Sequence, residues 1–216
     1  MVISYRELRR LELEILRASY NSGQQSLDVH QLISVNVDQF HGIEIEDSAA
    51  HIARVAILIT DHQINEQSRH IGQPRPPIPL GKMPNIVCAN ALTTDWASVI
   101  SPERCTYIVG NPPFIGAATM RAALGDGYVE ALRSTWPEVP ESADYVMFWW
   151  HHAATLVSSG QAERFGFITT NSLKQTFNRR VVQLALDAGE AGGAPRPPPP
   201  PPPPRRARRG RPPPPP

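Results

Sequence analysis

Short apolar segments alternate with helical patterns along most of this chain, and this alternation constrains the fold more than any other feature. Apolar segments bounded by turn residues occur at residues 39–45, 85–89, 107–109 and 165–169. Apolar residues at helical spacing occur at residues 3–20, 47–64, 142–159 and 172–186. Strands that alternate with helices predict an α/β fold, with a doubly wound, mostly parallel sheet. In such sheets ligands bind at the carboxyl ends of the strands.

Local signals refine this pattern. Asp47 is expected to cap the second helix, and Asn171 with Ser172 the last one. Tyr145 and Phe148 recur at helical spacing with Trp149 and are expected in the core. The proline-rich stretch at residues 68–83 predicts a surface loop.

The chain changes character after residue 189. Of its 24 prolines, 14 lie within residues 195–216, together with six arginines and no acidic residue. Eight consecutive prolines offer no backbone donors and fix every φ, so neither a helix nor a sheet can form there. We expect a folded domain at residues 1–189 and a disordered Pro/Arg-rich tail at residues 190–216. The tail fits either a ligand for aromatic grooves or polyanions, or a stretch translated out of frame.

Charge and cysteine usage narrow the class of protein. Residues 1–190 carry 15 basic and 20 acidic groups, which argues against general electrostatic attraction to nucleic acid. No apolar run reaches the roughly 18 residues of a membrane span, and no secretory signal opens the chain. Cys88 and Cys105 suggest no disulfide framework and are expected as core thiols. A protein of the cytoplasm, without a membrane partner, is the expectation.

The tetrapeptide Asn111-Pro112-Pro113-Phe114 directly follows a predicted strand. Proline restricts itself and the residue before it, so the loop is held extended and presents carbonyl groups without competing N–H donors. The Asn111 side-chain oxygen and the Pro112 carbonyl can accept both hydrogens of an exocyclic amine, while Phe114 offers a flat face to a planar base. Two acceptors oppose delocalisation of the amine lone pair and favour methylation without a metal or a nucleophilic side chain. In isolation, the same four residues also fit a simple loop.

Two further polar residues end predicted strands. Glu44 closes the run GIEI, where a carboxylate can accept hydrogen bonds from ribose hydroxyls. Asn90 follows the next strand, where its amide can address an adenine ring. Taken alone, Glu44 could equally be an acidic residue near the start of a helix, and Asn90 could equally be a residue that forms a turn. Polar residues thus follow three predicted strands in succession. This arrangement predicts a nucleotide cofactor beside the Asn111–Phe114 loop, which we call the acceptor loop.

Longer runs carry a specific resemblance. The chain contains, in this order, GIEIEDSAAHIARVAILITDHQIN, ANALTTDW, TYIVGNPPFIGA, ADYVMFWWHHAATLV and GFITTNSLKQTFNRRVV. Over residues 5–189 it resembles the DNA adenine-N6 methyltransferases fused into bacterial type II restriction-modification enzymes, the MmeI-like kind. The resemblance implies a Rossmann-like methyltransferase sheet, S-adenosyl-L-methionine as cofactor, and double-stranded DNA from which the target adenine is flipped out.

Site residues follow from the resemblance by position. Asn111, Pro112 and Phe114 correspond to the contacts of the target adenine, and Pro113 fixes the loop. The cofactor-binding positions implied are Glu44 and Ile45 for the ribose, and Asn90 and Ala91 for the adenine ring. No metal site is implied, and the adjacent pair His151-His152 lacks the spacing of helical metal ligands.

The chain also departs from the family. Relatives carry a strand and a glycine-rich turn resembling DPACGSGNF directly before the helix that begins here near Ser4. We therefore expect a partial catalytic domain, truncated at both ends and with little or no activity alone, whose DNA contacts depend on an absent recognition domain. Two alternatives stay open: a non-catalytic remnant or binding module, and an amino-methyltransferase acting on RNA guanine or protein glutamine.

Overall fold

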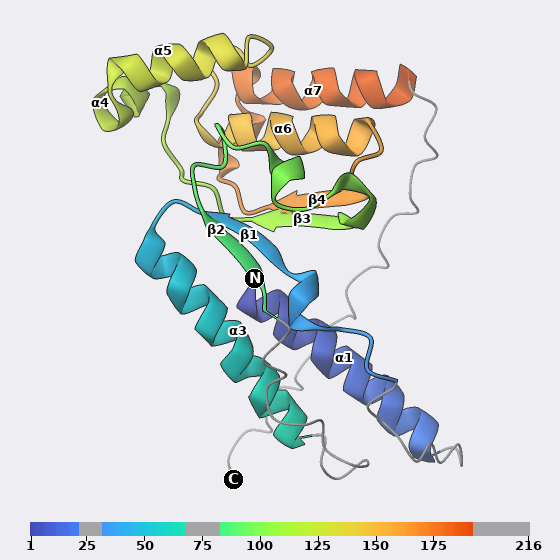
Figure 1. The fold of residues 1–216 in the computed structure, drawn as a ribbon. Helices are drawn as coiled ribbons and strands as arrows, with labels where there is room; N and C mark the ends of the chain where they lie inside the picture. Colours follow the sequence, from blue (N-terminus) through green and yellow to red (C-terminus); the bar gives the residue numbers. More distant parts are fainter. Residues whose placement is uncertain (22–31, 68–82, 192–216) are drawn as a thin grey trace, which may run out of the picture.

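Figure 1 shows the chain as a computed structural model, which describes residues 1–21, 32–67 and 83–191. The predicted loop at residues 68–83 lies outside the described residues except at its last position. The predicted tail at residues 190–216 lies outside them beyond residue 191.

Helices and strands follow one another along the described chain, although no α-helix separates the second strand from the third. The helices are α1 (Val2–Asn21), α3 (Asp47–Gln67), α4 (Met120–Leu124), α5 (Asp126–Thr135), α6 (Val146–Ser158) and α7 (Thr176–Ala191). The strands are β1 (His41–Glu44), β2 (Asn85–Cys88), β3 (Tyr107–Gly110) and β4 (Arg164–Phe167). Short 3-10 turns precede α4 and α7, at Ala117–Thr119 and Asn171–Lys174.

The four strands form two separate sheets of two parallel strands each. β1 pairs with β2 from His41–Asn85 to Glu44–Cys88, and β3 pairs with β4 from Tyr107–Arg164 to Gly110–Phe167. The predicted mixed α/β class and parallel pairing are confirmed, but one continuous sheet is not formed. Within the described residues, no strand pairs with both sheets.

α1 and α3 lie on one side of the molecule and pack with the β1–β2 sheet (Figure 1). Their shared core consists of Tyr5, Val37, Ala50, Ile57 and Ile86. These residues come from α1, α3, β2 and the turn before β1, so this cluster holds the first sheet against its two helices.

A buried charged group lies between α1 and α3. The side chain of Arg9 is fully buried, and it is ion-paired with Glu12 and hydrogen-bonded to the Asn65 side chain at 2.8 Å. Its Nε lies 3.9 Å from Oδ1 of Asp61, which also accepts a hydrogen bond from the Tyr5 hydroxyl. Burying a charge is unfavourable unless partners compensate it, and these side chains provide that compensation.

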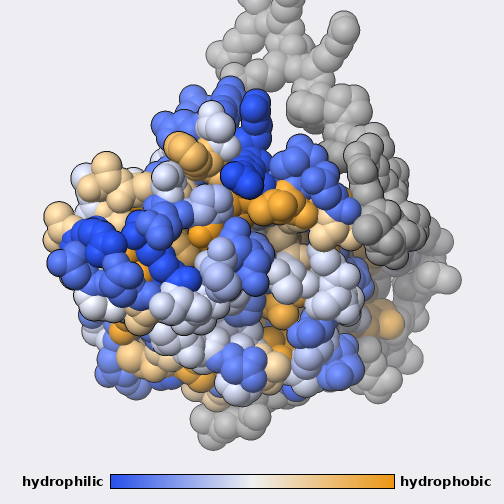
Figure 2. Space-filling view, turned by 90° about the horizontal axis from the view of Figure 1, so that it is seen from above, coloured by the Kyte–Doolittle hydropathy of each residue, from blue (hydrophilic) through white to orange (hydrophobic). Residues whose placement is uncertain are grey.

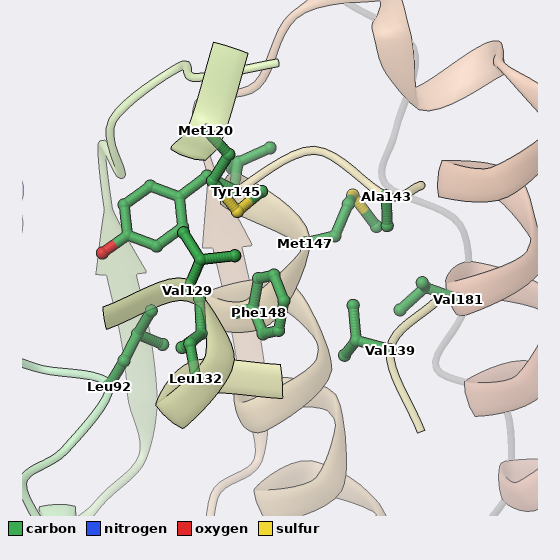
Figure 3. Close-up of a cluster of buried hydrophobic side chains, with 11 residues drawn as sticks. Leu92, Met120, Val129, Leu132, Val139, Ala143, Tyr145, Met147, Phe148 and Val181 are labelled. Carbon is green, nitrogen blue, oxygen red and sulfur yellow. The ribbon is translucent and has the colours of Figure 1, made fainter. Parts of the chain in front are cut away.

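A second core holds α4, α5, α6 and α7 together. Figure 3 shows Val129 and Leu132 of α5 facing Tyr145 and Phe148 at the start of α6. The predicted core positions of Tyr145 and Phe148 are therefore confirmed, at 5% and 1% exposure. α6 in turn covers one face of the β3–β4 sheet, where Trp150 meets Phe165 edge to face at 5.2 Å between ring centroids.

Element boundaries differ from the predictions at three helix starts. Asp47 lies in the first turn of α3, because the carbonyl of Glu46 accepts the first helical bond from Ala50. α6 begins at Val146, four residues later than expected. Asn171 and Ser172 form a 3-10 turn that the Thr170 side chain caps, so α7 begins only at Thr176.

Figure 2 views the molecule from the side of α5 and α7 and shows apolar residues scattered among polar ones. Scattered exposed apolar residues are ordinary on a protein surface. None of the described helices is long and apolar enough to cross a bilayer.

Candidate active site

The Asn111–Phe114 loop begins where β3 ends, at the carboxyl edge that the sequence predicts. Asn111 and Pro113 are exposed, Pro112 is buried, and Phe114 is 49% exposed. The loop is thus anchored by one proline while the asparagine and the phenylalanine face solvent. Its side chains are free to meet a ligand from outside.

Gly110 allows β3 and β4 to approach closely just before this loop. A Cβ atom at position 110 would lie 3.1 Å from the ring of Phe167, closer than most side-chain contacts in proteins. The missing side chain therefore lets the Phe167 ring pack on the strand that presents Asn111.

The residues that follow Phe114 are fixed to the start of α6. The carbonyl of Ile115 accepts a hydrogen bond from the Tyr145 backbone at 2.9 Å. The backbone N–H of Ala117 donates to Oδ1 of Asp144 at 3.1 Å. Two hydrogen bonds from adjacent residues thus hold the end of the loop against one helix.

Glu44 and Asn90 come together at the carboxyl edge of the first sheet. The N–H of Ala89 donates to the carbonyl of Glu44 at 2.9 Å, which extends the ladder one step past the paired strands. Oε1 of Glu44 accepts from the backbone of Glu46 at 3.2 Å. Ile45, beside it, is 65% exposed. A carboxylate with further lone pairs and an exposed apolar side chain therefore share this edge.

Both polar atoms of the Asn90 side chain are already engaged. Oδ1 accepts from the backbone of Leu92 at 2.9 Å, and Nδ2 donates to the Tyr128 hydroxyl at 2.9 Å. An amide oxygen has two lone pairs and an amide nitrogen two hydrogens, so each atom retains one further hydrogen-bonding position. The neighbouring Ala91 is half-buried, and its carbonyl accepts from the Trp96 indole at 2.7 Å.

A tyrosine pair links this edge to the acceptor loop. The hydroxyls of Tyr128 and Tyr145 lie 2.8 Å apart, and the backbone of Tyr145 holds Ile115. Burial and the hydrogen bond to Tyr128 raise the pKa of Tyr145 well above its usual value, so the Tyr145 phenol is neutral at physiological pH. Asn90 after β2 is thus connected to the loop after β3 by hydrogen bonds at the two ends of Tyr145, its hydroxyl and its backbone N–H.

Three residues of this arrangement escape sequence reasoning: Tyr128, Asp144 and Asn178. Asn178 is 2% exposed and binds Asp144 through both its amide oxygen and its amide nitrogen. The sequence does offer one signal for Asp144: it is the single acidic residue of the run ADYVMFWW, and its neighbours are apolar residues that are expected in the core. A charged group at such a position needs a buried partner, but its identity depends on tertiary structure.

The other residues singled out from the sequence are two cysteines and an adjacent pair of histidines. Cys88 is exposed, so its predicted core position is wrong: as the last residue of β2 it lies at the open edge of the sheet. Cys105 is half-buried, and burial raises the pKa of its thiol. His152 stacks between Trp96 and Trp136, with ring centroids at 4.1 and 4.8 Å. Within the described ranges, no group of three or more His, Cys, Asp or Glu residues is placed to hold a metal ion.

Comparisons with known proteins agree on one family. Residues 1–184 match the family described as the MmeI DNA-methyltransferase domain. DNA methyltransferase A of Bacillus subtilis (strain 168) is 31% identical over 182 residues, which are 81% of this chain and 20% of that protein. The solved structure of the type IIL restriction-modification enzyme MmeI in complex with DNA is similar with a TM-score of 0.72 at 39% identity. That match covers 87% of this chain and 25% of the solved one, so the chain spans a quarter or less of either relative's length.

Proposed function

The chain belongs to the MmeI family of DNA methyltransferases, and from this premise we propose that it carries the catalytic residues of an adenine-specific enzyme dependent on S-adenosyl-L-methionine. The methyl acceptor is N6 of an adenine flipped out of double-stranded DNA. The acidic excess of residues 1–190 offers DNA little general attraction, so the duplex is held mainly by other parts of the enzyme.

One observation carries the proposal: Asn111 and Phe114 are exposed on a loop whose two ends are fixed. β3 fixes the beginning, and the bonds to Tyr145 and Asp144 fix the end. The amide oxygen of Asn111 and the carbonyl of Pro112 accept the two hydrogens of the adenine amine, and Phe114 stacks on the ring. Held in this way, the nitrogen lone pair points away from the ring and toward the methyl donor.

The cofactor is assigned to the carboxyl edge of β1 and β2. S-Adenosyl-L-methionine supplies an electrophilic methyl group on a sulfonium. Glu44 accepts hydrogen bonds from the ribose hydroxyls, and Asn90 uses its remaining N–H and lone pair for the adenine edge. Ile45 and Ala91 flank the adenosine, and a bound nucleoside would cover the exposed side chain of Ile45.

Methyl transfer from radiolabelled S-adenosyl-L-methionine tests the proposal. The purified chain is offered duplex DNA, RNA and a glutamine-containing protein, and the labelled product is identified after digestion. N6-Methyladenine from DNA is expected, at a slow rate because the duplex is held mainly by other parts of the enzyme. Label in guanine or glutamine, or no cofactor binding at all, would replace the proposal with one of the alternatives.

Substitution of Asn111 by alanine locates the acceptor. Loss of one oxygen that stabilises the reacting amine should lower the rate at least about 100-fold, while cofactor affinity changes less than about twofold. Asn171→Ala removes an exposed asparagine from the loop after β4 and serves as the matched control, with activity close to wild type. If Asn111→Ala keeps its activity, the acceptor role of this loop is wrong.

A further inference from the structure

Asp144 and Asn178 are joined by two hydrogen bonds across 34 residues of sequence. The Asp144 backbone donates to Oδ1 of Asn178 at 2.8 Å, and Nδ2 of Asn178 donates to Oδ2 of Asp144 at 2.8 Å. Nδ2 also donates to the carbonyl of Ser172 at 2.9 Å. Asn178 therefore uses both polar atoms of its side chain, and it ties the segment before α6 to the loop after β4.

The other oxygen of Asp144 faces the acceptor loop. Oδ1 accepts from Ala117, and a Cβ atom at position 116 would lie 3.7 Å from it, so Gly116 passes close to the carboxylate. The backbone of the next residue, Tyr145, holds Ile115. Two of the three residues directly after Phe114 are thus hydrogen-bonded to one short segment, and Asn178 orients that segment.

The Asp144 carboxylate is charged at neutral pH. Burial on its own raises the pKa of Asp144, but the hydrogen bonds from Ser172, Asn178 and the Ala117 backbone outweigh burial and hold the pKa below its usual value. Hydrogen bonds to a charged acceptor are shorter and stronger than neutral ones, so this attachment is firm.

We propose that Asp144 and Asn178 are a positioning pair that sets the place of Asn111 and Phe114 for the target base. The inference rests on the proposed function and adds two residues to it that touch neither the base nor the cofactor. Through Ser172, the same pair couples the loops that leave the carboxyl ends of β3 and β4. The functional consequence is that the acceptor loop is preorganised before DNA arrives.

Three isosteric variants test the pair: Asp144→Asn, Asn178→Asp, and the two combined. The first places two amide donors face to face, and the second places two carboxylates face to face. In the double variant, the new amide at position 144 again meets a carboxylate at position 178. The bond from Ala117 is kept there, while the bond from position 178 to the Ser172 carbonyl is lost. Gln183→Ala, which removes an exposed amide from the same helix, is the control.

Two measurements separate positioning from mere stability. Hydrogen exchange at the Ala117 amide should accelerate about tenfold or more in each single variant, while exchange in the interior of α6 stays within about threefold. The turnover number for methyl transfer should fall about 10- to 100-fold, with DNA and cofactor dissociation constants changed less than about threefold. The double variant should recover slow loop exchange and most of the turnover, and the control should match wild type.

Other outcomes overturn the inference. One is that hydrogen exchange in the loop and turnover are unchanged in the single variants. Another is that exchange accelerates equally in the loop and in α6. A third is that the double variant recovers neither slow loop exchange nor turnover relative to the single variants. If a single variant does not fold, the double variant decides by the same criteria. If the wild-type chain transfers no methyl group, the proposed function fails, while the exchange measurements still decide whether the pair holds the loop.

Discussion

Asn90 and Tyr128 are joined by a hydrogen bond of 2.9 Å that connects the end of β2 to α5 across 38 residues of sequence. Oδ1 of Asn90 accepts a hydrogen bond from Leu92, and Nδ2 donates to Tyr128. Together, the two bonds determine which way the Asn90 amide points. The Tyr128 hydroxyl in turn meets that of Tyr145. The orientation of a proposed cofactor contact thus depends on a tyrosine of another element.

Tyr128→Phe should remove one of the two hydrogen bonds that orient the Asn90 side chain without creating a cavity in the core. The ring remains while the hydroxyl is lost, so unfolding free energy should fall by about 1 kcal/mol. Affinity for S-adenosyl-L-methionine should fall roughly three- to tenfold, because the ligand must then supply the ordering of the Asn90 amide that the Tyr128 bond provides. Calorimetric titration and chemical unfolding measure the two effects. Tyr107→Phe, which removes the hydroxyl of an exposed tyrosine, is the control, and equal cofactor affinity in both variants would contradict the prediction.

Local sequence predicts the elements that flank the site but not the contacts within it. Each strand has a compact apolar run, and the Asn111–Phe114 loop is recognisable from its prolines, so these positions follow from neighbours in sequence. The pairs Asn90–Tyr128 and Asp144–Asn178 join residues 38 and 34 positions apart. Such pairings are set by tertiary packing, which leaves no periodic signal in the chain.

α4 and α5 illustrate a second reason for failure. Only Val129 and Leu132 of α5 are buried, so its apolar repeat is too short to predict a helix. Glycines at positions 125 and 127 further obscure the pattern. The separation of the strands into two sheets is likewise a property of pairing partners and not of the strand sequences.

Gly125, between α4 and α5, has a φ of 84° and a ψ of 148°, a backbone conformation that is strained for residues with a side chain. Gly125→Ala should therefore lower the unfolding free energy by about 1–3 kcal/mol, although nothing lies within 4 Å of the added methyl group. Gly127→Ala is the matched comparison: it also meets open space, but in helical backbone, and should stabilise by about 0.5 kcal/mol. Thermal unfolding of the two variants should give shifts of opposite sign, and shifts of the same sign would refute the argument.

Arg9→Ala should be among the most destabilising single changes in the first core. It removes the partner of Glu12 and leaves Asp61, which is 3% exposed, without its nearby positive charge. Breaking a buried pair from one side costs about 3–5 kcal/mol. Arg6→Ala removes an exposed arginine paired with Glu7 and should change stability by less than about 0.5 kcal/mol. Urea unfolding compares them, and a loss below about 1 kcal/mol for Arg9→Ala would show that water replaces the lost partners.

His152 should make the fold sensitive to mild acid. Burial first, and then the neighbouring His151, lower its pKa from 6.5 to about 4. Between these two pH values, His152 is protonated in the unfolded chain but neutral in the folded chain. The folded state therefore keeps its full stability above pH 6.5 and loses stability as the pH falls toward 4. The loss between pH 7 and 5 should be about 1 kcal/mol, since solvent reaches part of the ring.

The variant His152→Phe keeps an aromatic ring between Trp96 and Trp136 but has no proton to bind. Its unfolding free energy should therefore depend less on pH between 7 and 5 than that of the wild type, by about that same 1 kcal/mol. His51→Gln removes an exposed imidazole on α3 and is the control. Urea unfolding at pH 7, 6 and 5 checks all three proteins. If His152→Phe loses as much stability as the wild type over this range, the proton is taken up elsewhere and the buried imidazole is not the acid-sensitive group.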